Sequence, residues 1–373
     1  PPCRSHAEAV EILAANDPQR LFSHSAMTEH ASIVFMYPGG GAQYARMGLD
    51  LYEKEPVFRE WIDRGLEVLK ARFDADLASV FFSRADSADE LTAALDKPAT
   101  QLPLTFLVEY ALTRLWESLG IRPDALIGHS MGENTAAAVA GVMSFEDALG
   151  LLRLRGRLFE QAPPGGMLSV PLSVSELRDI AGPDIEISAA NGPQLAVASG
   201  SPAALDELSA ALASAGVDAQ RIRVDVAAHS RLLEGILGEF RAYLQGIELH
   251  APEIPIVSNR SGTWLTNEQA QDAEYWVQHL RNTVLFADGV ATLLEKSNRV
   301  FLEVGPGNVL GSCVRQNGNA PVQRVLPSMR HPKDELDDQV FLRAVIGRLW
   351  AIGVDMDLGQ LHPKPRQRVP LPT

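Results

Sequence analysis

Residues 125–141 have the sequence ALIGHSMGENTAAAVAG, and this stretch decides the fold class of the 373-residue chain. A short apolar segment ends in a G-x-S-x-G pentapeptide at 128–132, and small residues suited to a closely packed helix follow. A strand, a sharp turn and a helix in this order are typical of a parallel α/β sheet with a serine at its edge. The context predicts that Ser130 is a nucleophile; an incidental serine in a tight turn is the alternative.

Further segments extend the predicted sheet on both sides of this unit. The apolar run 33–37 ends in a glycine loop, and strand-like segments return at 254–259 and 300–307. Strands that alternate with helical patterns indicate a parallel sheet covered by helices. We therefore expect a large α/β-hydrolase-like subdomain formed by residues 32–166 and 227–315.

The segment 167–226 has a different pattern and predicts a separate unit. Its order is strand, helix, strand, strand, helix, strand, which is that of a ferredoxin-like subdomain inserted in the larger one. The flanking segments are interpreted as a leader or linker remnant (1–31) and a C-terminal linker (316–373), the latter ending in the proline-rich stretch LHPKPRQRVPLPT. Because the chain begins with Pro-Pro and has no initial methionine, we expect it to be a piece of a longer protein.

Composition narrows the classes of function. A formal net charge of −14 and a pI of about 5.1 disfavour a nucleic-acid partner. The two cysteines, Cys3 and Cys313, are too few for a disulfide framework and lack the spacing of a zinc site, so no metal is expected. No apolar run reaches the roughly 18 residues of a spanning helix. The sequence predicts a cytoplasmic protein with no membrane association and no bound cofactor.

A nucleophilic serine requires a general base, since its free hydroxyl is barely ionised at neutral pH. Of nine histidines, His229 stands in VDVAAHS, between an expected strand (222–226) and an amphipathic helix (231–244). A side chain at such a junction can face a cleft, so His229 is the predicted base. His279, on a helix with the sequence WVQHL, is the competing candidate, and its alternative role is that of a wall or packing residue.

Arg155 lies near the centre of the apolar face of the helix expected at 148–159, whereas Arg153 and Arg157 fall on the opposite, solvated side. A buried guanidinium requires an anion, because burying an unpaired charge costs several kcal/mol. Its planar geometry suits a carboxylate. The sequence leaves open whether that carboxylate belongs to a ligand or to an acidic residue of the protein.

The glycine loop PGGGAQ (38–43) offers backbone N–H groups that no side chain blocks. It lacks the Lys-Ser/Thr pair of a phosphate-binding loop and the G-x-G-x-x-G spacing. A better interpretation is that it supplies one N–H of an oxyanion hole, with Met131 N–H as the other, as in hydrolases that combine a glycine-rich loop with an elbow serine.

Together these segments resemble the acyltransferase domains of modular type I polyketide synthases and the malonyl-CoA:acyl carrier protein transacylases, over about residues 32–315. The motifs that carry the resemblance occur in the expected order: YPGGGAQYARMG, TQLP, GHSMGE, LRLRGRLFE, AAHS, SN (258–259), YWVQHL and LEVGPG.

The resemblance implies a two-step exchange without a bound cofactor. Ser130 would take an acyl group from a CoA thioester with His229 as base, and the phosphopantetheine thiol of an acyl carrier protein would then accept it. A neighbouring ketosynthase is implied in the parent polypeptide. The resemblance also assigns roles to further positions: oxyanion binding to Gly40 and Met131, substrate binding to Arg155, Gln101, Ala228 and His279, and orientation of the histidine by a strand-end backbone carbonyl to Asn259.

Two positions depart from the family pattern. Gly40 replaces the usual glutamine of the first motif, which keeps a backbone donor but loses a side-chain contact. The segment before the base is VAAH (226–229), neither the HAFH of malonyl-type nor the YASH of methylmalonyl-type domains. With Met131 after the serine, malonyl is favoured and methylmalonyl stays open. A basic patch for the carrier protein is expected among Arg153, Arg157, Lys364, Arg366 and Arg368.

Two other classes of function compete with acyl transfer. A serine esterase or thioesterase of the α/β-hydrolase class shares the elbow and predicts an acid partner for the base, for which Asp225 is available in the right order. A non-catalytic docking domain of a larger synthase would require no intact serine, histidine and arginine. The environment of Arg155 discriminates among these alternatives.

Overall fold

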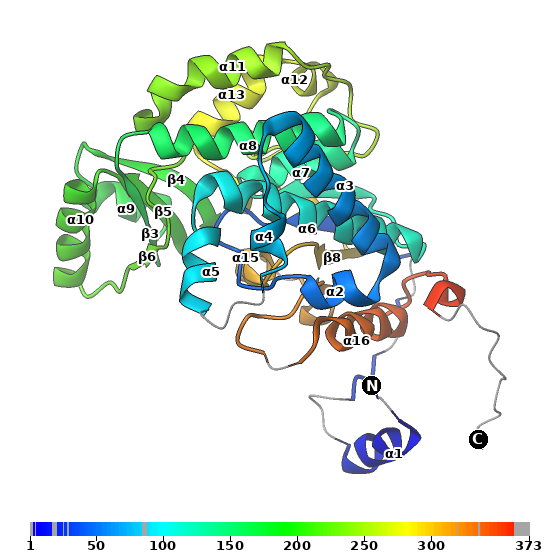
Figure 1. Cartoon of the computed structure of the whole chain (residues 1–373). Helices are drawn as coiled ribbons and strands as arrows, with labels where there is room; N and C mark the ends of the chain where they lie inside the picture. The colour runs from blue at the N-terminus through cyan, green and yellow to red at the C-terminus, as the bar shows by residue number, and fades with distance from the viewer. Residues whose placement is uncertain are drawn as a thin grey trace.

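The computed structural model describes residues 3, 5–16, 21–24, 26, 27, 30–83, 88–318, 320–334 and 336–361. Within them lie a parallel five-stranded sheet covered by helices on both faces and a smaller antiparallel four-stranded sheet to one side (Figure 1). No helix in these ranges is both long and apolar enough to cross a membrane.

The large sheet has the strand order β7-β2-β1-β8-β9, and every neighbouring pair is parallel. In the centre, Tyr37 at the end of β1 pairs with Gly128 at the end of β2. The glycine loop that follows β1 and the elbow that follows β2 therefore emerge side by side at the carboxyl edge of the sheet. The strands are β1 (Ser32–Tyr37), β2 (Ala125–Gly128), β7 (Ile256–Val257), β8 (Arg299–Glu303) and β9 (Val325–Pro327).

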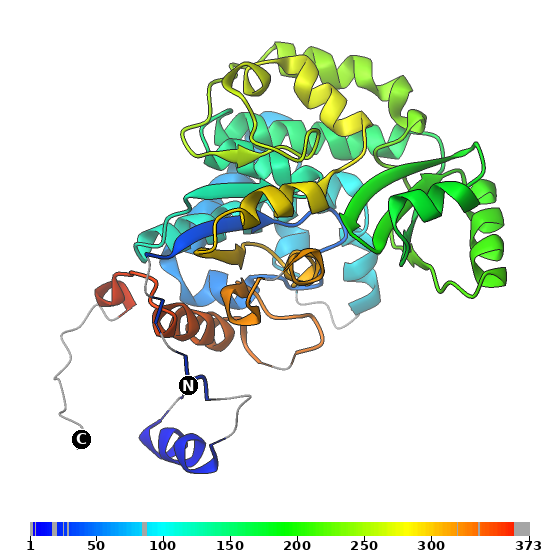
Figure 2. The same cartoon turned by 180° about the vertical axis from the view of Figure 1, so that it is seen from behind.

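Alternation along β1 explains why the large sheet is buried on both faces. Ile33, Phe35 and Tyr37 belong to a hydrophobic cluster on one face, and Val34 and Met36 belong to a second cluster on the other face. The larger cluster is closed by α3 (Pro56–Phe73), α6 (Pro98–Ser118), α7 (Met131–Val139) and α8 (Phe145–Gln161), and the smaller one by α14 (Phe286–Leu294) and α15 (Val309–Asn317). Figure 2 shows the second face from behind.

The small sheet has the order β4-β5-β3-β6 and is antiparallel throughout. The strands are β3 (Gly166–Val170), β4 (Ile185–Gly192), β5 (Leu195–Gly200) and β6 (Gln220–Ile222), and α9 (Val174–Ile180) and α10 (Pro202–Ser214) pack on them. The order of strands and helices predicted for residues 167–226 is the order in the structure. The last strand, however, ends at Ile222 and does not continue to Val226, so an irregular segment leads to His229.

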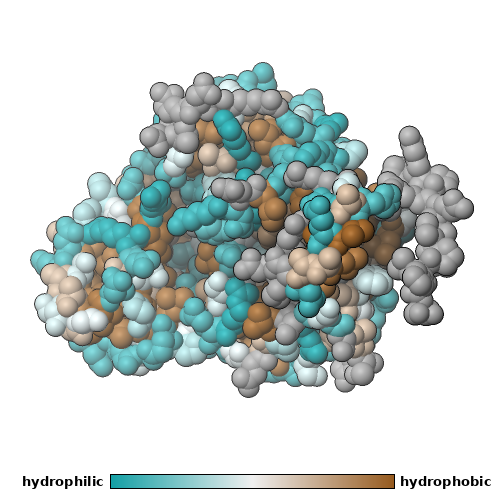
Figure 3. Space-filling view, turned by 90° about the horizontal axis from the view of Figure 1, so that it is seen from below, coloured by the Kyte–Doolittle hydropathy of each residue, from teal (hydrophilic) through white to brown (hydrophobic). Residues whose placement is uncertain are grey.

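The remaining elements connect and flank the two sheets. They are α1 (His6–Ala15), α2 (Leu49–Lys54), α4 (Ala78–Phe81), α5 (Ala88–Leu95), η1 (Arg231–Ile236), α11 (Leu237–Gln245), α12 (Asn267–Ala270), α13 (Ala273–Arg281), η2 (Val322–Arg324), α16 (Asp338–Ala351) and η3 (Leu358–Leu361). Figure 3 views the molecule from below, where hydrophobic side chains are interspersed with polar ones.

The interpretation of 316–373 as a linker does not describe its first part. Strand β9 forms the edge of the large sheet, and Leu342, Val345, Ile346 and Leu349 of α16 are buried in the main hydrophobic cluster. These residues belong to the folded body because they supply part of its core. The proline-rich end of the chain, with Lys364, Arg366 and Arg368, lies outside the described residues.

Candidate active site

The elbow at the end of β2 places Ser130 in a strained conformation with φ 53° and ψ −119°. Both glycines of the pentapeptide permit this turn. A Cβ at Gly128 would lie 2.0 Å from Glu133 N, and one at Gly132 would lie 2.1 Å from Tyr37 O, so the turn can form only where these side chains are absent. Ser130 remains partly exposed at the N-terminus of α7.

The structure pairs Ser130 with His229, the base expected from the sequence. The two atoms Ser130 Oγ and His229 Nε2 are 2.7 Å apart. On the far side of the ring, Nδ1 lies 3.0 Å from the carbonyl oxygen of Asn282 and 3.2 Å from that of His279, at the C-terminal end of α13. Carbonyl oxygens only accept hydrogen bonds, so Nδ1 carries the proton and Nε2 is free to accept the serine proton.

The electrostatic environment keeps His229 neutral. Burial, followed by the positive charge of Arg155 and electrostatic interaction with His129, lowers the pKa of His229 to about 3. Among the described residues no carboxylate contacts the ring. Asp225, the acid that the esterase interpretation made available, is exposed and has no hydrogen bond to the histidine. The pair is therefore a serine–histidine dyad supported by backbone carbonyls.

Arg155 faces the serine from α8. Its Nη2 donates to Ser130 Oγ at 2.9 Å, and its Nη1 donates to Asn134 Oδ1 at 3.1 Å. The side chain is 1% exposed, and its Nε has no hydrogen-bond partner. In the part of the chain that the structure describes, no acidic residue forms an ion pair with it, and burial lowers its pKa to about 9. A buried cation without an anionic partner is costly, so the environment of Arg155 has the charge and the donors that an anionic group would require.

The other two arginines of α8 differ from one another. Arg157 is exposed, as expected. Arg153 was expected to be solvated as well, but its side chain is half-buried. Its Nη1 donates to the carbonyl oxygen of Ala99 at 2.7 Å, and this hydrogen bond links α8 to α6.

Backbone donors and one amide lie around the serine hydroxyl. A Cβ at Gly39 would be 3.4 Å from Ser130 Cβ, which places the glycine loop against the elbow, and one at Gly40 would be 3.6 Å from Gln101 Oε1. Met131 N–H lies at the first turn of α7, where a helix N–H has no intrahelical acceptor. Gln101 is buried and its Nε2 is unpaired. The glycine loop, the start of α7 and Gln101 therefore provide hydrogen-bond donors close to the elbow.

Comparison with known proteins identifies the family. A sequence model described as an acyl transferase domain matches residues 34–356. The chain belongs to the acyl transferase domain family. The acyl transferase domain is 34% identical over 361 residues to a component of the phenolphthiocerol/phthiocerol polyketide synthase of Mycobacterium tuberculosis, a match that covers 96% of this chain and 24% of that protein. It thus spans about a quarter of the length of this relative.

Solved structures agree with this assignment. The acyl transferase domain of ZmaA superposes on this one with a TM-score of 0.91 at 35% identity, covering 99% of this chain and 86% of that chain. The acyltransferase domain from the second module of the salinomycin polyketide synthase gives a TM-score of 0.88 at 36% identity, covering 100% of this chain and 87% of that chain. The resemblance inferred from the ordered motifs is confirmed.

Asn259 has a different role in the acyl transferase domain from the predicted one. Its side chain accepts from Ser130 N–H at 2.9 Å and donates to Gly128 O at 2.8 Å, so it fixes the elbow. Its carbonyl oxygen accepts from Leu285 N–H and does not contact the histidine. The orienting carbonyls are those of His279 and Asn282, because the C-terminal end of α13, rather than the end of β7, lies beside the ring.

A buried polar cluster beneath the elbow was not predicted. Glu133 Oε2 accepts from Asn259 N–H at 2.6 Å, Glu133 Oε1 accepts from Tyr275 OH, and that hydroxyl also contacts Ser258 Oγ at 2.7 Å. Burial raises the pKa of Glu133 to about 7, although these hydrogen bonds act in the opposite direction. The only sequence signal was the position of Glu133 within GHSMGE, which identifies no partner.

His279 and Ala228, which were predicted to contact the substrate, lie in different places: His279 contacts the buried cluster around Glu133, and Ala228 lies next to His229. The His279 side chain is 1% exposed and its Nε2 lies 3.6 Å from Glu133 Oε2, beneath the elbow. Ala228 is 8% exposed and directly precedes His229. Among the described residues no group of three or more His, Cys, Asp or Glu side chains is arranged to hold a metal ion.

Proposed function

We propose that the domain transfers an extender unit with a free carboxylate from CoA to Ser130, and then to the phosphopantetheine thiol of an acyl carrier protein in polyketide synthesis. The observation that supports this proposal best is Arg155, buried, without an acidic partner among the described residues, and 2.9 Å from the nucleophile. A malonyl-type carboxylate would complete its hydrogen bonds.

In the first half-reaction, Ser130 Oγ attacks the thioester carbonyl carbon while its proton passes to His229 Nε2. The N–H groups of Gly40 and Met131 stabilise the oxyanion of the tetrahedral intermediate. Collapse breaks the C–S bond, and the sulfur of CoA leaves with the proton held by the imidazolium. The product is an ester on Ser130 and neutral His229.

The second half-reaction reverses the roles. The thiol of the carrier protein gives its proton to His229 Nε2 as its sulfur attacks the ester carbonyl carbon. The C–O bond to Ser130 breaks, and the serine oxygen recovers the proton from the imidazolium. Arg155 holds the carboxylate in both steps, so the acyl carbonyl stays in reach of the same donors.

Malonyl is the extender unit that we favour over methylmalonyl. The preference rests on Met131, which is fully buried at the start of α7 where methylmalonyl-type domains often carry glutamine. Ala228 is small and buried where a phenylalanine would crowd the α-carbon, so this position does not exclude a methyl branch. A difference of one methyl group supplies only about 1–3 kcal/mol of discrimination. In this scheme the large subdomain is α/β-hydrolase-like, the inserted one ferredoxin-like, and the domain works in the cytoplasm next to a ketosynthase.

The esterase alternative receives less support. It requires an acid behind the histidine, where two backbone carbonyls lie, and it leaves the buried guanidinium without a purpose. Contact with the carrier protein would involve the exposed Arg157 rather than Arg153, whose guanidinium is engaged with Ala99 O.

Mass spectrometry of the intact protein after mixing with malonyl-CoA tests the proposal. We expect a malonyl adduct that disappears in Ser130→Ala. Arg155→Ala should lower kcat/KM for malonyl-CoA by about 100-fold, equivalent to about 3 kcal/mol for a charged hydrogen-bonded pair, and should spare acetyl-CoA. Arg157→Ala, on the exposed side of the same helix, is the control. Malonyl loading that is unchanged in Arg155→Ala would contradict the assignment.

A further inference from the structure

We infer that Glu186, on β4 of the small sheet, is a positioning residue that holds the catalytic histidine in place from outside the large subdomain. The inference rests on the proposed function only in that Ser130 and His229 form the reactive pair. Glu186 itself touches neither of them. It acts through the two chain segments that hold the imidazole.

The first segment follows the histidine directly. His229 has φ 58°, a conformation that non-glycine residues seldom adopt and that persists only where neighbours impose it. Two residues on, Arg231 N–H donates to Glu186 Oε1 at 3.2 Å, and Arg231 Nε lies 3.8 Å from the same oxygen. The carboxylate therefore anchors the backbone immediately beyond the strained residue.

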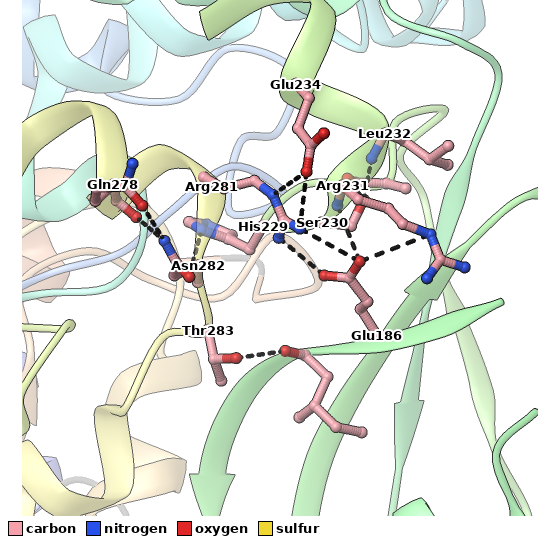
Figure 4. A network of polar contacts seen from close by, with 12 residues as sticks. Glu186, His229, Ser230, Arg231, Leu232, Glu234, Gln278, Arg281, Asn282 and Thr283 are labelled. Atoms are coloured by element: carbon pink, nitrogen blue, oxygen red, sulfur yellow. Dashed lines mark hydrogen bonds and ion pairs between the residues drawn. The ribbon is translucent and has the colours of Figure 1, made fainter. Parts of the chain in front are cut away.

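The second segment provides the acceptor for the imidazole. Asn282 O accepts from His229 Nδ1 at 3.0 Å, and the preceding residue, Arg281, donates through Nη1 to Glu186 Oε2 at 2.9 Å. Arg281 Nη2 also lies 3.5 Å from Glu186 Oε1, the oxygen that accepts from Arg231 N–H. One carboxylate thus contacts both segments, although they are about fifty residues apart in the sequence. Figure 4 shows Glu186 between the two arginines, with the His229–Asn282 contact beside them.

Neighbouring contacts make this anchor stiff. Thr283 Oγ1 donates to Ile187 O at 2.7 Å, and Val284 N–H donates to Ser188 O at 2.9 Å, so the residues after Asn282 pair along β4. The side chains of Glu186 and Arg281 are 26% and 20% exposed, which limits their screening by water.

Two other acids of the same network each contact only one arginine. Asp184 Oδ1 accepts from Arg231 Nη2 at 2.8 Å, and Glu234 Oε1 lies 3.3 Å from Arg281 Nη2. Their side chains are more exposed than that of Glu186, at 79% and 65%. Within the described contacts, Glu186 is the acid that contacts both arginines. Glu234 lies in η1, shortly after His229, so its ion pair with Arg281 also joins the two segments. Asp184 contacts only Arg231 and therefore provides the matched control.

The test uses Glu186→Gln in the full chain, with Asp184→Asn and Asp184→Ala as controls. The readout is the rate at which a fluorophosphonate probe labels Ser130, because this reaction needs the serine–histidine pair but no carboxylate-bearing substrate. We expect Glu186→Gln to slow labelling by about tenfold or more, since small displacements of a catalytic group have effects of this size. The controls should stay within about threefold of the wild type.

A second readout separates positioning from general destabilisation. The KM for malonyl-CoA should change little in Glu186→Gln while kcat falls, because Arg155 and the elbow lie on other elements. If Glu186→Gln does not fold, Arg281→Lys is measured in the same way, since it keeps the charge but loses the planar donor pair. A labelling rate within threefold of the wild type, or controls that are slowed equally, would overturn the inference. Failure of the wild type to accept malonyl-CoA would instead refute the proposed function, because probe labelling does not depend on it.

Discussion

Ser130 and His229 both have positive φ values, and different parts of the molecule impose them. At Ser130, the close approach of β1 to α7 permitted by Gly132 and the side chain of Asn259 fix the turn. At His229, the constraint comes from the end of α13 and from β4. The nucleophile and the base can therefore be perturbed separately.

The low pKa of His229 has a consequence for the pH dependence of the dyad. The base is active when it is neutral, and a histidine with a pKa of about 3 stays neutral throughout the range from pH 5 to pH 8. The rate of fluorophosphonate labelling of Ser130 should therefore be nearly constant across this range. A histidine with an ordinary pKa of about 6.5 would instead lose half of this rate near that pH. Labelling rates measured at half-unit intervals distinguish the two cases.

Arg155→Ala provides a check on the cause. Burial is the main reason for the low pKa of His229, and the charge of Arg155 is the second. Removing that charge should raise the pKa of His229. The decline of the labelling rate at acidic pH should then occur at a higher pH than in the wild type. An acid limb that is the same in both proteins would mean that the guanidinium does not influence the base. The same logic applies to a bound substrate carboxylate, which would offset the charge of Arg155 and make His229 a stronger base.

At the level of elements, β8 and α15 are joined by a buried carboxylate. Glu303, the last residue of β8, accepts from Leu310 N–H at 3.0 Å and from Gly311 N–H at 2.8 Å, at the start of α15. These N–H groups have no acceptor inside the helix, and the helix dipole favours negative charge there. Burial nevertheless outweighs both effects and raises the pKa of Glu303 to about 7.

This shift predicts how Glu303 affects stability. Its pKa is higher in the folded than in the unfolded protein, so its contribution to stability is complete below about pH 4.5 and is lost as the pH rises through about 7. Between these limits wild-type stability should fall by up to about 3 kcal/mol relative to Glu303→Gln, which does not titrate. Urea unfolding of both proteins at pH 5 and pH 8 measures the difference. Parallel curves for the two proteins would show that Glu303 has an ordinary pKa.

For the whole molecule, local patterns in the sequence singled out the three side chains that the structure brings together, Ser130, His229 and Arg155. The elbow serine follows from strand, glycine and helix signals within seventeen residues, and the buried face of Arg155 follows from helical periodicity. The carbonyl groups that orient His229 could not be predicted in this way. They belong to residues 279 and 282, and only the docking of α13 beside the histidine gives them a function.

The predictions for Asn259 and for the first part of residues 316–373 were wrong for the same reason: the contacts of these residues are made with distant parts of the chain. Asn259 lies just after a two-residue strand, and its side chain turns toward the elbow, where it accepts from Ser130 N–H and donates to Gly128 O. The prolines at the end of the chain predict an extended linker, but they say nothing about the residues before them. The apolar positions of α16 have a weak period that becomes meaningful only once the main core is present to receive them.

Leu349 and Trp350 test whether α16 is part of the folded body. The two residues are neighbours on this helix, but the side chain of Leu349 is fully buried and that of Trp350 is 62% exposed. If α16 packs as described, Leu349→Ala leaves a cavity in the main core and lowers the free energy of unfolding by about 2–5 kcal/mol. Trp350→Ala removes a larger side chain from the surface and should change it by less than about 1 kcal/mol. Thermal and urea unfolding of the two variants measure the contrast. A segment that merely rested on the surface as a linker would make both substitutions nearly neutral, because neither side chain would leave a core cavity behind.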